Sequence, residues 1–78
     1  MNPREKAQLL IIIGFATARG SDVSIQHLIN SLMEKRKKTE AEKDELLKAF
    51  EFAKDQGVQT YFSNSDMQIL ESAIKYEI

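Results

Sequence analysis

Residues 7–16 of this 78-residue chain read AQLLIIIGFA and form its most apolar stretch. Each residue of an α-helix advances by about 100°, so the five aliphatic residues at 9–13 sweep more than a full turn. A helix that is apolar all round is a buried helix, whereas a surface helix has a single apolar stripe. The stretch therefore predicts a helix that is covered on nearly every side, by the rest of the chain or by a second copy or partner.

Local signals predict where this first helix, over residues 3–19, begins and ends. Asn2 is a suitable N-cap, and Glu5 can bond back to the Asn2 amide as a capping box. Gly20 is suited to end the helix in the left-handed conformation. Gly14, inside the helix, costs about 1 kcal/mol relative to alanine. It indicates either a close approach by another helix or a position that simply tolerates glycine.

A second helix is predicted over residues 24–37, with Asp22 or Ser24 as its cap. Its apolar residues have the i, i+3, i+4, i+7, i+8 spacing of one buried stripe. They are Ile25, Leu28, Ile29, Leu32 and Met33. The polar residues between them are expected to face solvent, and these are Gln26, His27, Asn30 and Ser31.

A basic run at 35–38 precedes Thr39 and Glu42, which have capping-box spacing. Basic residues suit the end of one helix and acidic residues the start of the next. We therefore prefer a turn at 38–39 to one continuous helix, although the sequence allows both. A third helix then spans residues 40–56 and is ended by Gly57.

Residues 58–62 are predicted to form an extended connector, because a lone strand has no partner here. Tyr61 and Phe62 are expected to plug the end of the bundle. Ser63 is a suitable N-cap for a fourth helix over 64–77.

Short loops between four helices predict an all-α fold, a small four-helix bundle in a single domain over residues 1–78. Three of the helices carry more apolar surface than one stripe needs, which predicts a homodimer or another protein partner. The side chains expected at such an interface are Phe52, Tyr61, Phe62, Ile69 and Tyr76. Each of them, taken singly, is also compatible with a place in the core.

Composition limits the possible classes of function. The chain has no cysteine, which excludes disulfides and thiolate metal sites and fits a reducing compartment such as the cytoplasm. With 11 basic and 12 acidic residues, it has no net attraction to nucleic acid or to an anionic membrane. The apolar run is too short to span a bilayer, which needs about 20 residues. We expect a cytoplasmic protein without a membrane partner.

No motif indicates an enzyme, a metal site or a cofactor. His27 is the only histidine, and Ser31 lies one turn further on. A catalytic base would also need an orienting partner, so a surface histidine is the simpler interpretation. The three glycines form neither a dinucleotide-binding fingerprint nor a P-loop.

A helix-turn-helix over residues 15–38 is the alternative hypothesis. It would bind nucleic acid through base-reading and basic side chains, namely Gln26, His27, Asn30, Lys35, Arg36, Lys37 and Lys38. Arg19 and Gln26, however, stand where that motif usually has apolar residues, and the chain is not strongly basic. The main prediction is a non-enzymatic protein–protein interaction module of the adaptor or inhibitor type. Its small size suits an accessory protein of a bacterium or a phage.

Overall fold

The computed structural model describes residues 1–21 and 25–78, which form four α-helices and one short 3-10 turn. The elements in chain order are α1 (Pro3–Ala18), α2 (Ile25–Met33), α3 (Glu40–Asp55), η1 (Val58–Thr60) and α4 (Asn64–Tyr76). The predicted all-α fold with four helices is confirmed, and the described residues contain no strand. The predicted caps of the second helix, Asp22 and Ser24, lie outside the described residues.

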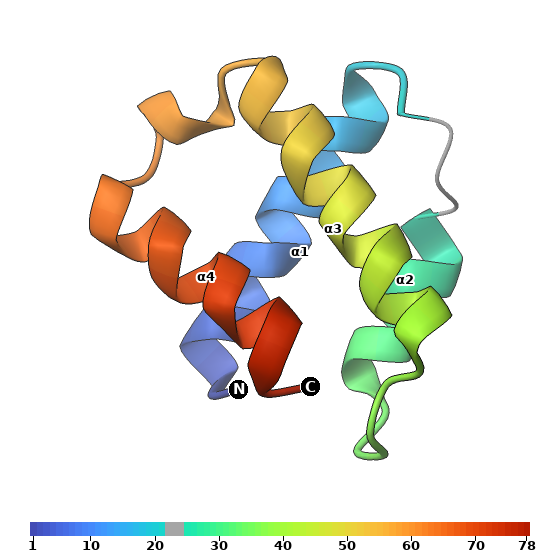
Figure 1. Ribbon diagram of the computed structural model, residues 1–78. Helices are drawn as coiled ribbons and strands as arrows, with labels where there is room; N and C mark the ends of the chain where they lie inside the picture. The colour runs from blue at the N-terminus through green and yellow to red at the C-terminus, as the bar shows by residue number, and fades with distance from the viewer. Residues whose placement is uncertain (22–24) are drawn as a thin grey trace.

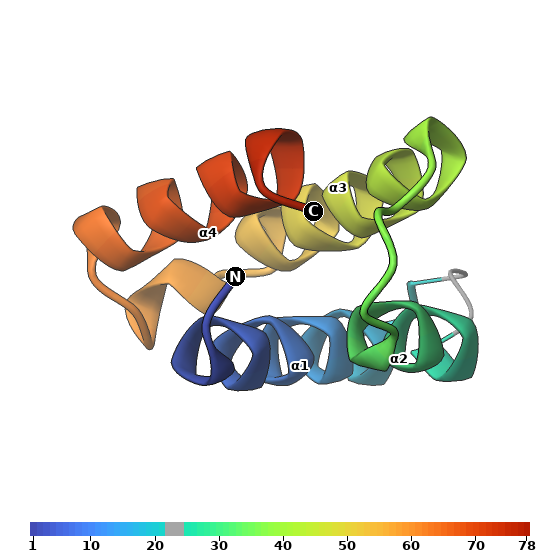
Figure 2. The same cartoon turned by 90° about the horizontal axis from the view of Figure 1, so that it is seen from below.

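The helices form two layers, with α1 and α2 in one and α3 and α4 in the other (Figure 2). α1 crosses α3 at the centre of the molecule, and the two ends of the chain lie close together (Figure 1). The core lies between the layers and includes Leu9, Ile12, Ile13, Ala16, Leu28, Leu32, Leu46, Phe50, Val58, Leu70 and Ile74. Each layer therefore has one buried side and one side that faces away from the core.

The ends of α1 follow the predicted signals. The Asn2 side chain accepts a hydrogen bond from the Glu5 amide at 2.8 Å, and the Glu5 carboxylate accepts one from the Asn2 amide at 3.0 Å. At the other end, Gly20 has a φ of +101°, a conformation that L side chains rarely adopt. Gly20 and the following residue donate backbone hydrogen bonds into the last turn, as in a Schellman motif.

The described part of one chain covers only one side of α1, so the predicted cover of its other side by a second copy or a partner stays a prediction. Its inner side belongs to the core, but Ile11 is 59% exposed, and Ala7 and Ala18 are exposed as well. A Cβ atom added to Gly14 would meet no described atom within 4 Å beyond its chain neighbours and its own helix backbone, so no other described helix approaches closely there. The reason is the two-layer arrangement, in which the outer side of α1 has no third layer against it.

α2 ends at Met33 and not at residue 37 as predicted. The Lys38 ammonium group is nearly buried and donates to the backbone carbonyls of Glu34 and Arg36, each at 2.8 Å. In a continuing helix these carbonyls would instead accept bonds from amides four residues further on. The preferred break between the second and third helices is confirmed, but the turn spans 34–39.

α2 also turns a different side to the core from the one predicted. Leu28 and Leu32 are buried as expected, but Met33 is 62% exposed. Ser31, which was expected in solvent, is buried and donates to the Glu42 carboxylate of α3 at 3.0 Å. A hydroxyl group with a carboxylate partner can be buried without an unsatisfied donor. The Ser31–Glu42 pair therefore accompanies an orientation of α2 in which Ser31 faces the core and Met33 faces solvent, and not the orientation that the apolar stripe alone predicts.

The connector after α3 is not extended, so this prediction was wrong. Gly57 ends α3 as predicted, with a φ of +93°, and the chain then makes the 3-10 turn η1. Val58 is the buried plug of this end of the bundle, whereas Tyr61 is 72% exposed and Phe62 is half-buried. The turn closes with a hydrogen bond from the Tyr61 amide to the Val58 carbonyl at 3.0 Å, which a β-leaning composition does not reveal.

Replacement of Thr39 by alanine should lower the free energy of unfolding by about 1 kcal/mol. The Thr39 hydroxyl accepts a bond from the Glu42 amide at 3.2 Å and caps α3. The measurement is urea denaturation, with Thr39→Ser as the matched control because serine retains the hydroxyl group. Equal stability of the alanine and serine variants would contradict this role of the cap.

Candidate functional site

The five side chains predicted at a protein interface lie in three different places. Phe52 and Phe62 are half-buried and pack against the core. Tyr61 is exposed and lies edge-on to a phenylalanine ring of α1, with a centroid distance of 6.1 Å. Ile69 and Tyr76 both project from α4, where they are 48% and 82% exposed. Only this last pair shares one exposed surface.

Ile69 and Tyr76 lie two turns apart on one side of α4, together with Ser65 and Ser72. Alternating steps of four and three residues keep these four positions on a single face of the helix. All four residues are exposed, and we name them the α4 outer face. A shallow hollow of ≈ 340 Å³ adjoins it and is lined by Ser65, Gln68, Ile69, Ser72 and Glu77. Two large apolar side chains thus stand apart with small polar ones between them.

A second uncovered apolar surface lies on α1. From Ala7 to Ala18 the helix has no charged residue, although a helix with one side in solvent usually has polar and charged residues there. The positions that face away from the core again alternate by four and three residues. They are Ala7, Ile11, Gly14 and Ala18, and we name them the α1 outer face. Sequence reasoning based on aromatic residues did not identify this face.

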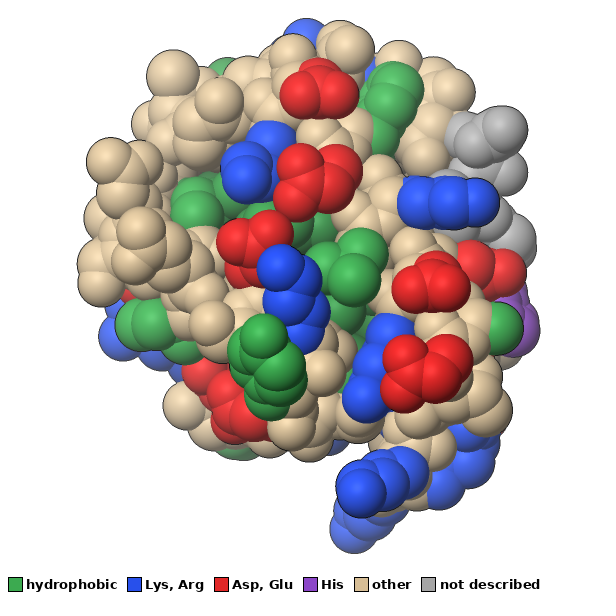
Figure 3. All heavy atoms as spheres, viewed as in Figure 1, with side chains coloured by type: hydrophobic (Ala, Val, Ile, Leu, Met, Phe, Trp, Pro, Cys, Tyr) green, Lys and Arg blue, Asp and Glu red, His purple; other side chains and the backbone are tan. Residues whose placement is uncertain are grey.

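The side of the molecule formed by α3 and α4 has a different character (Figure 3). Positive and negative side chains alternate over it, and apolar atoms show only in patches between them. Neighbours on one helix form ion pairs at 3.7 to 3.8 Å, namely Lys43–Glu40, Lys54–Glu51 and Lys75–Glu71. Exposed pairs of this kind contribute little to stability, so they mainly keep this side solvated.

Glu42 is the centre of a hydrogen-bond network that joins α2, the 34–39 turn and α3. The Arg36 guanidinium donates to both carboxylate oxygens, at 2.8 and 2.6 Å, and also bonds to Glu34. The Ser31 hydroxyl and the Thr39 amide donate to the same carboxylate. The bonds from Arg36 and then from Thr39 hold the pKa of Glu42 well below its usual range. The two carboxylates in turn raise the pKa of Arg36.

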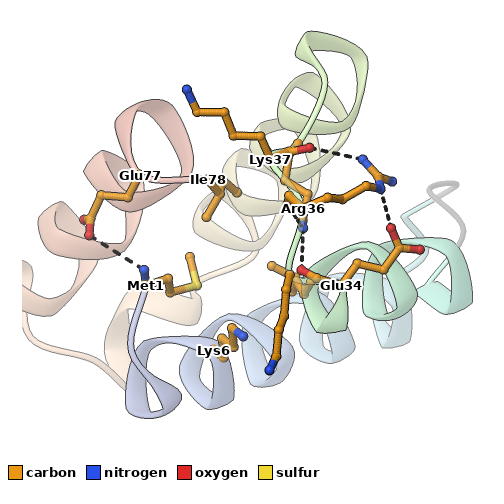
Figure 4. A pocket seen from close by; sticks show the side chains of 10 residues that line it. Met1, Lys6, Glu34, Arg36, Lys37, Glu77 and Ile78 are labelled. Atoms are coloured by element: carbon orange, nitrogen blue, oxygen red, sulfur yellow. Dashed lines mark hydrogen bonds and ion pairs between the residues drawn. The ribbon is translucent and has the colours of Figure 1, made fainter.

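A hollow of ≈ 250 Å³ lies between this turn and the two ends of the chain (Figure 4). Met1, Leu32 and Ile78 are the apolar residues of its lining, and the other lining residues are charged, five basic and two acidic. The amino group of Met1 lies 3.9 Å from the Glu77 carboxylate. Lys37 points away from the other labelled side chains (Figure 4). The lining is predominantly basic, but it includes the residues that the Glu42 network uses.

The predicted nucleic-acid residues do not form one free basic surface. Arg36 is held by carboxylates, and the Lys38 ammonium is nearly buried on backbone carbonyls. Within residues 1–21 and 25–78, the ammonium groups of Lys35 and Lys37 have no hydrogen bond or ion pair. The basic run therefore contributes two of its four cations to the fold.

The polar residues of α2 are also engaged with one another or with α3. Gln26 donates to the Asn30 side chain at 3.1 Å, and His27 lies 3.5 Å from the Glu45 carboxylate. Ser31 lies one helical turn from His27 on the same side of α2, but it is buried and its hydroxyl donates to the Glu42 carboxylate of α3. The structure therefore does not bring His27 and Ser31 together as a base and a nucleophile.

The described part of the chain has no group of three or more His, Cys, Asp or Glu side chains placed to hold a metal ion. None of its helices combines the length and the apolar character that a membrane span requires. No protein-family model, no curated protein and no solved structure gives a significant match to the chain. Its function is therefore to be inferred from its own surfaces.

The Glu42 network should make stability depend on pH in a specific direction. Because the pKa of Glu42 is lower in the folded chain, its ionised form stabilises the fold above the unfolded pKa of about 4.3. That contribution is lost as the pH falls below this value. Urea denaturation should show Glu42→Gln to be destabilised at neutral pH and to lose less stability on acidification than the natural chain. The control is the exposed Glu51→Gln, and a Glu42→Gln variant with an unchanged pH dependence would contradict the role of this carboxylate.

We expect no binding to generic duplex DNA at about 50 mM salt, where phosphate contacts are strong. The reason is that two of the four cations of the basic run are already used within the fold. Fluorescence anisotropy with a labelled duplex is the measurement. A complex that forms with the natural chain and is lost in Lys35→Ala/Lys37→Ala would contradict this and favour the helix-turn-helix alternative.

Proposed function

We propose that this protein is a non-enzymatic protein–protein interaction module of the adaptor or inhibitor type that acts as a homodimer. The supporting observation is a closed core together with large apolar side chains outside it. Residues such as Phe50, Leu46 and Ile74 are almost completely buried. Among the side chains that the structure describes, the large hydrophobic residues that stay exposed are Ile11, Met33, Tyr61, Ile69 and Tyr76. Scattered exposed apolar residues are normal, but a shared face marks a candidate contact surface.

The α4 outer face is the surface that we assign to the partner protein. Tyr76 is its most exposed residue and offers a large ring with a polar hydroxyl, a combination that is common in interface hot spots. Ile69 supplies a second apolar anchor, and the small side chains of Ser65 and Ser72 leave room for a partner side chain between the two. The four residues of this face are uncharged, and the nearest charge in the adjoining hollow is the Glu77 carboxylate. It therefore fits the apolar side of a partner helix or an aromatic side chain.

We assign an adaptor or inhibitor role because the α4 outer face is an apolar contact surface on a stable scaffold. Such proteins act by occupying a site on their partner, which requires an anchoring face and a stable scaffold. The two-layer bundle holds α4 in place through its buried side, where Met67, Leu70 and Ile74 pack in the core. The absence of cysteine supports our further proposal of a cytoplasmic location.

Photo-cross-linking in the native host tests this function. A benzophenone amino acid placed at Tyr76 should give one discrete product with a partner protein, and the same label at Lys48 on α3 should not. Ile69→Arg in the same chain should remove the product, because a buried unpaired charge opposes binding. The variant should still melt as the natural chain does, because Ile69 is exposed. Identical products from positions 48 and 76, or a product that survives Ile69→Arg, would contradict the proposal.

A further inference from the structure

We propose that a second copy of this chain covers the α1 outer face, with the two α1 helices antiparallel about a two-fold axis. The inference refines the proposed function, because it assigns the homodimer contact to one face and leaves the α4 outer face for another protein.

The first argument is the distribution of apolar residues around α1. At about 100° per residue, Ala7, Ile11, Gly14 and Ala18 lie within an arc of about 60°. The buried residues of α1 occupy the opposite side. The helix is thus apolar on two opposite sides, and the described chain covers only one of them. Since a helix of this kind is usually buried, the outer side has the character of an interface.

Gly14 is the second argument, because nothing within one chain requires a glycine there. Its φ is not in the left-handed region, whereas Gly20 and Gly57 both have a positive φ. Apart from its chain neighbours and the backbone of its own helix, no described atom would lie within 4 Å of a Cβ added to it. Glycine is among the least favourable residues inside a helix. What it creates is a notch in the outer face, one turn from the projecting side chain of Ile11.

The third argument is that the face is complementary to itself when it is reversed. Its four positions are symmetric about the midpoint between residues 12 and 13. A two-fold axis at this point sets Ile11 opposite Gly14 of the second copy, and Ala7 opposite Ala18 of the second copy. Each isoleucine then enters the notch of the other chain, and small residues at both ends let the backbones approach. A parallel pair would oppose Ile11 to Ile11 and leave the two notches empty.

Charge at the helix ends agrees with the antiparallel arrangement. Arg4 of each copy would lie beside the last turn of the other α1, where a positive charge is favourable. That turn contains no basic residue, whereas α3 and α4 have Lys54 and Lys75 in theirs. Arg19, which follows the helix, is turned onto the Phe15 ring, 4.6 Å from its centroid.

The small area of the α1 outer face limits the affinity of the dimer. A helix of 16 residues is about 24 Å long and about 10 Å wide, less than the roughly 800 Å² per partner of a standard interface. α2 lies in the same layer as α1 (Figure 2), and on it Met33 is exposed and Ile29 is half-buried. We therefore expect a dissociation constant in the micromolar range.

Gly14→Ala should have opposite effects on the single chain and on the dimer. The added methyl group meets no atom of its own chain and improves helix propensity, so the melting temperature of a dilute sample should rise by about 4–8 °C. It also fills the notch, so sedimentation equilibrium should show dimerisation weakened by about tenfold or more. Ser72→Ala on the α4 outer face is the matched control and should not change the dimer. A natural chain that stays monomeric at high micromolar concentration, or a Gly14→Ala dimer as tight as the natural one, would overturn the inference.

Disulfide cross-linking tests the direction of the pair, and the absence of natural cysteines makes it specific. A mixture of Ala7→Cys and Ala18→Cys chains should form the mixed dimer under mild oxidation, because a disulfide needs closely opposed Cα atoms. Each variant alone should give little product. Dimers formed by each variant with itself would establish a parallel pair, and no product at all would show that α1 is not the contact. Either result overturns the proposal.

Two charge substitutions separate this inference from the proposed function. Ile11→Arg should abolish the dimer and keep the partner cross-link at Tyr76, whereas Ile69→Arg should do the reverse. A partner cross-link without any dimer of the natural chain would leave the proposed partner-binding role of the α4 outer face standing, and it would overturn both the proposed homodimer and this inference. A dimer without any partner cross-link would leave this inference standing and overturn the proposed partner-binding role of the α4 outer face.

Discussion

A helix without a charged residue over twelve positions, 7–18, is usually buried on all sides, and the described chain buries only one side of it. α3 packs across the inner side of α1, where Leu9, Ile12 and Ala16 are buried. The molecule is only two helices deep, and its shortest extent is 18 Å. No third layer is therefore present to bury Ile11. The charge-free run of α1 therefore supplies the core on its inner side and leaves an apolar surface on its outer side.

The Glu42 carboxylate stabilises the corner between α2 and α3. It also shows which features of the fold could be predicted from the sequence and which could not. Helix ends at Asn2, Gly20 and Thr39 were predictable, because caps and left-handed glycines depend on near neighbours in the sequence. The rotation of α2 was not, because the carboxylate that buries Ser31 is eleven residues away. Arg36 bonds to that same carboxylate and Lys38 bonds to backbone carbonyls of the turn, so two of the four cations of the predicted phosphate-binding run stabilise the α2–α3 corner.

The sequence predicted the exposed candidate residues only in part, because the prediction relied on aromatic and bulky residues and not on the charge-free run in α1. Counting aromatic and bulky residues found Ile69 and Tyr76, but it also selected Phe52, which packs against the core. It overlooked Ile11, although the charge-free run from 7 to 18 is visible in the sequence. Whether such a run is covered by its own chain depends on the number of layers, which is a property of the tertiary structure and has no local signature.

The most direct test of this account is an isotope-filtered nuclear Overhauser measurement on a mixture of labelled and unlabelled chains. The account predicts intermolecular contacts between the Ile11 methyl groups of one chain and the α-protons of Gly14 in the other. These contacts should weaken on dilution as the dimer dissociates. Their absence at millimolar concentration, or intermolecular contacts of Ile11 only with Ile11, would contradict the central claim that two copies bury the α1 outer face.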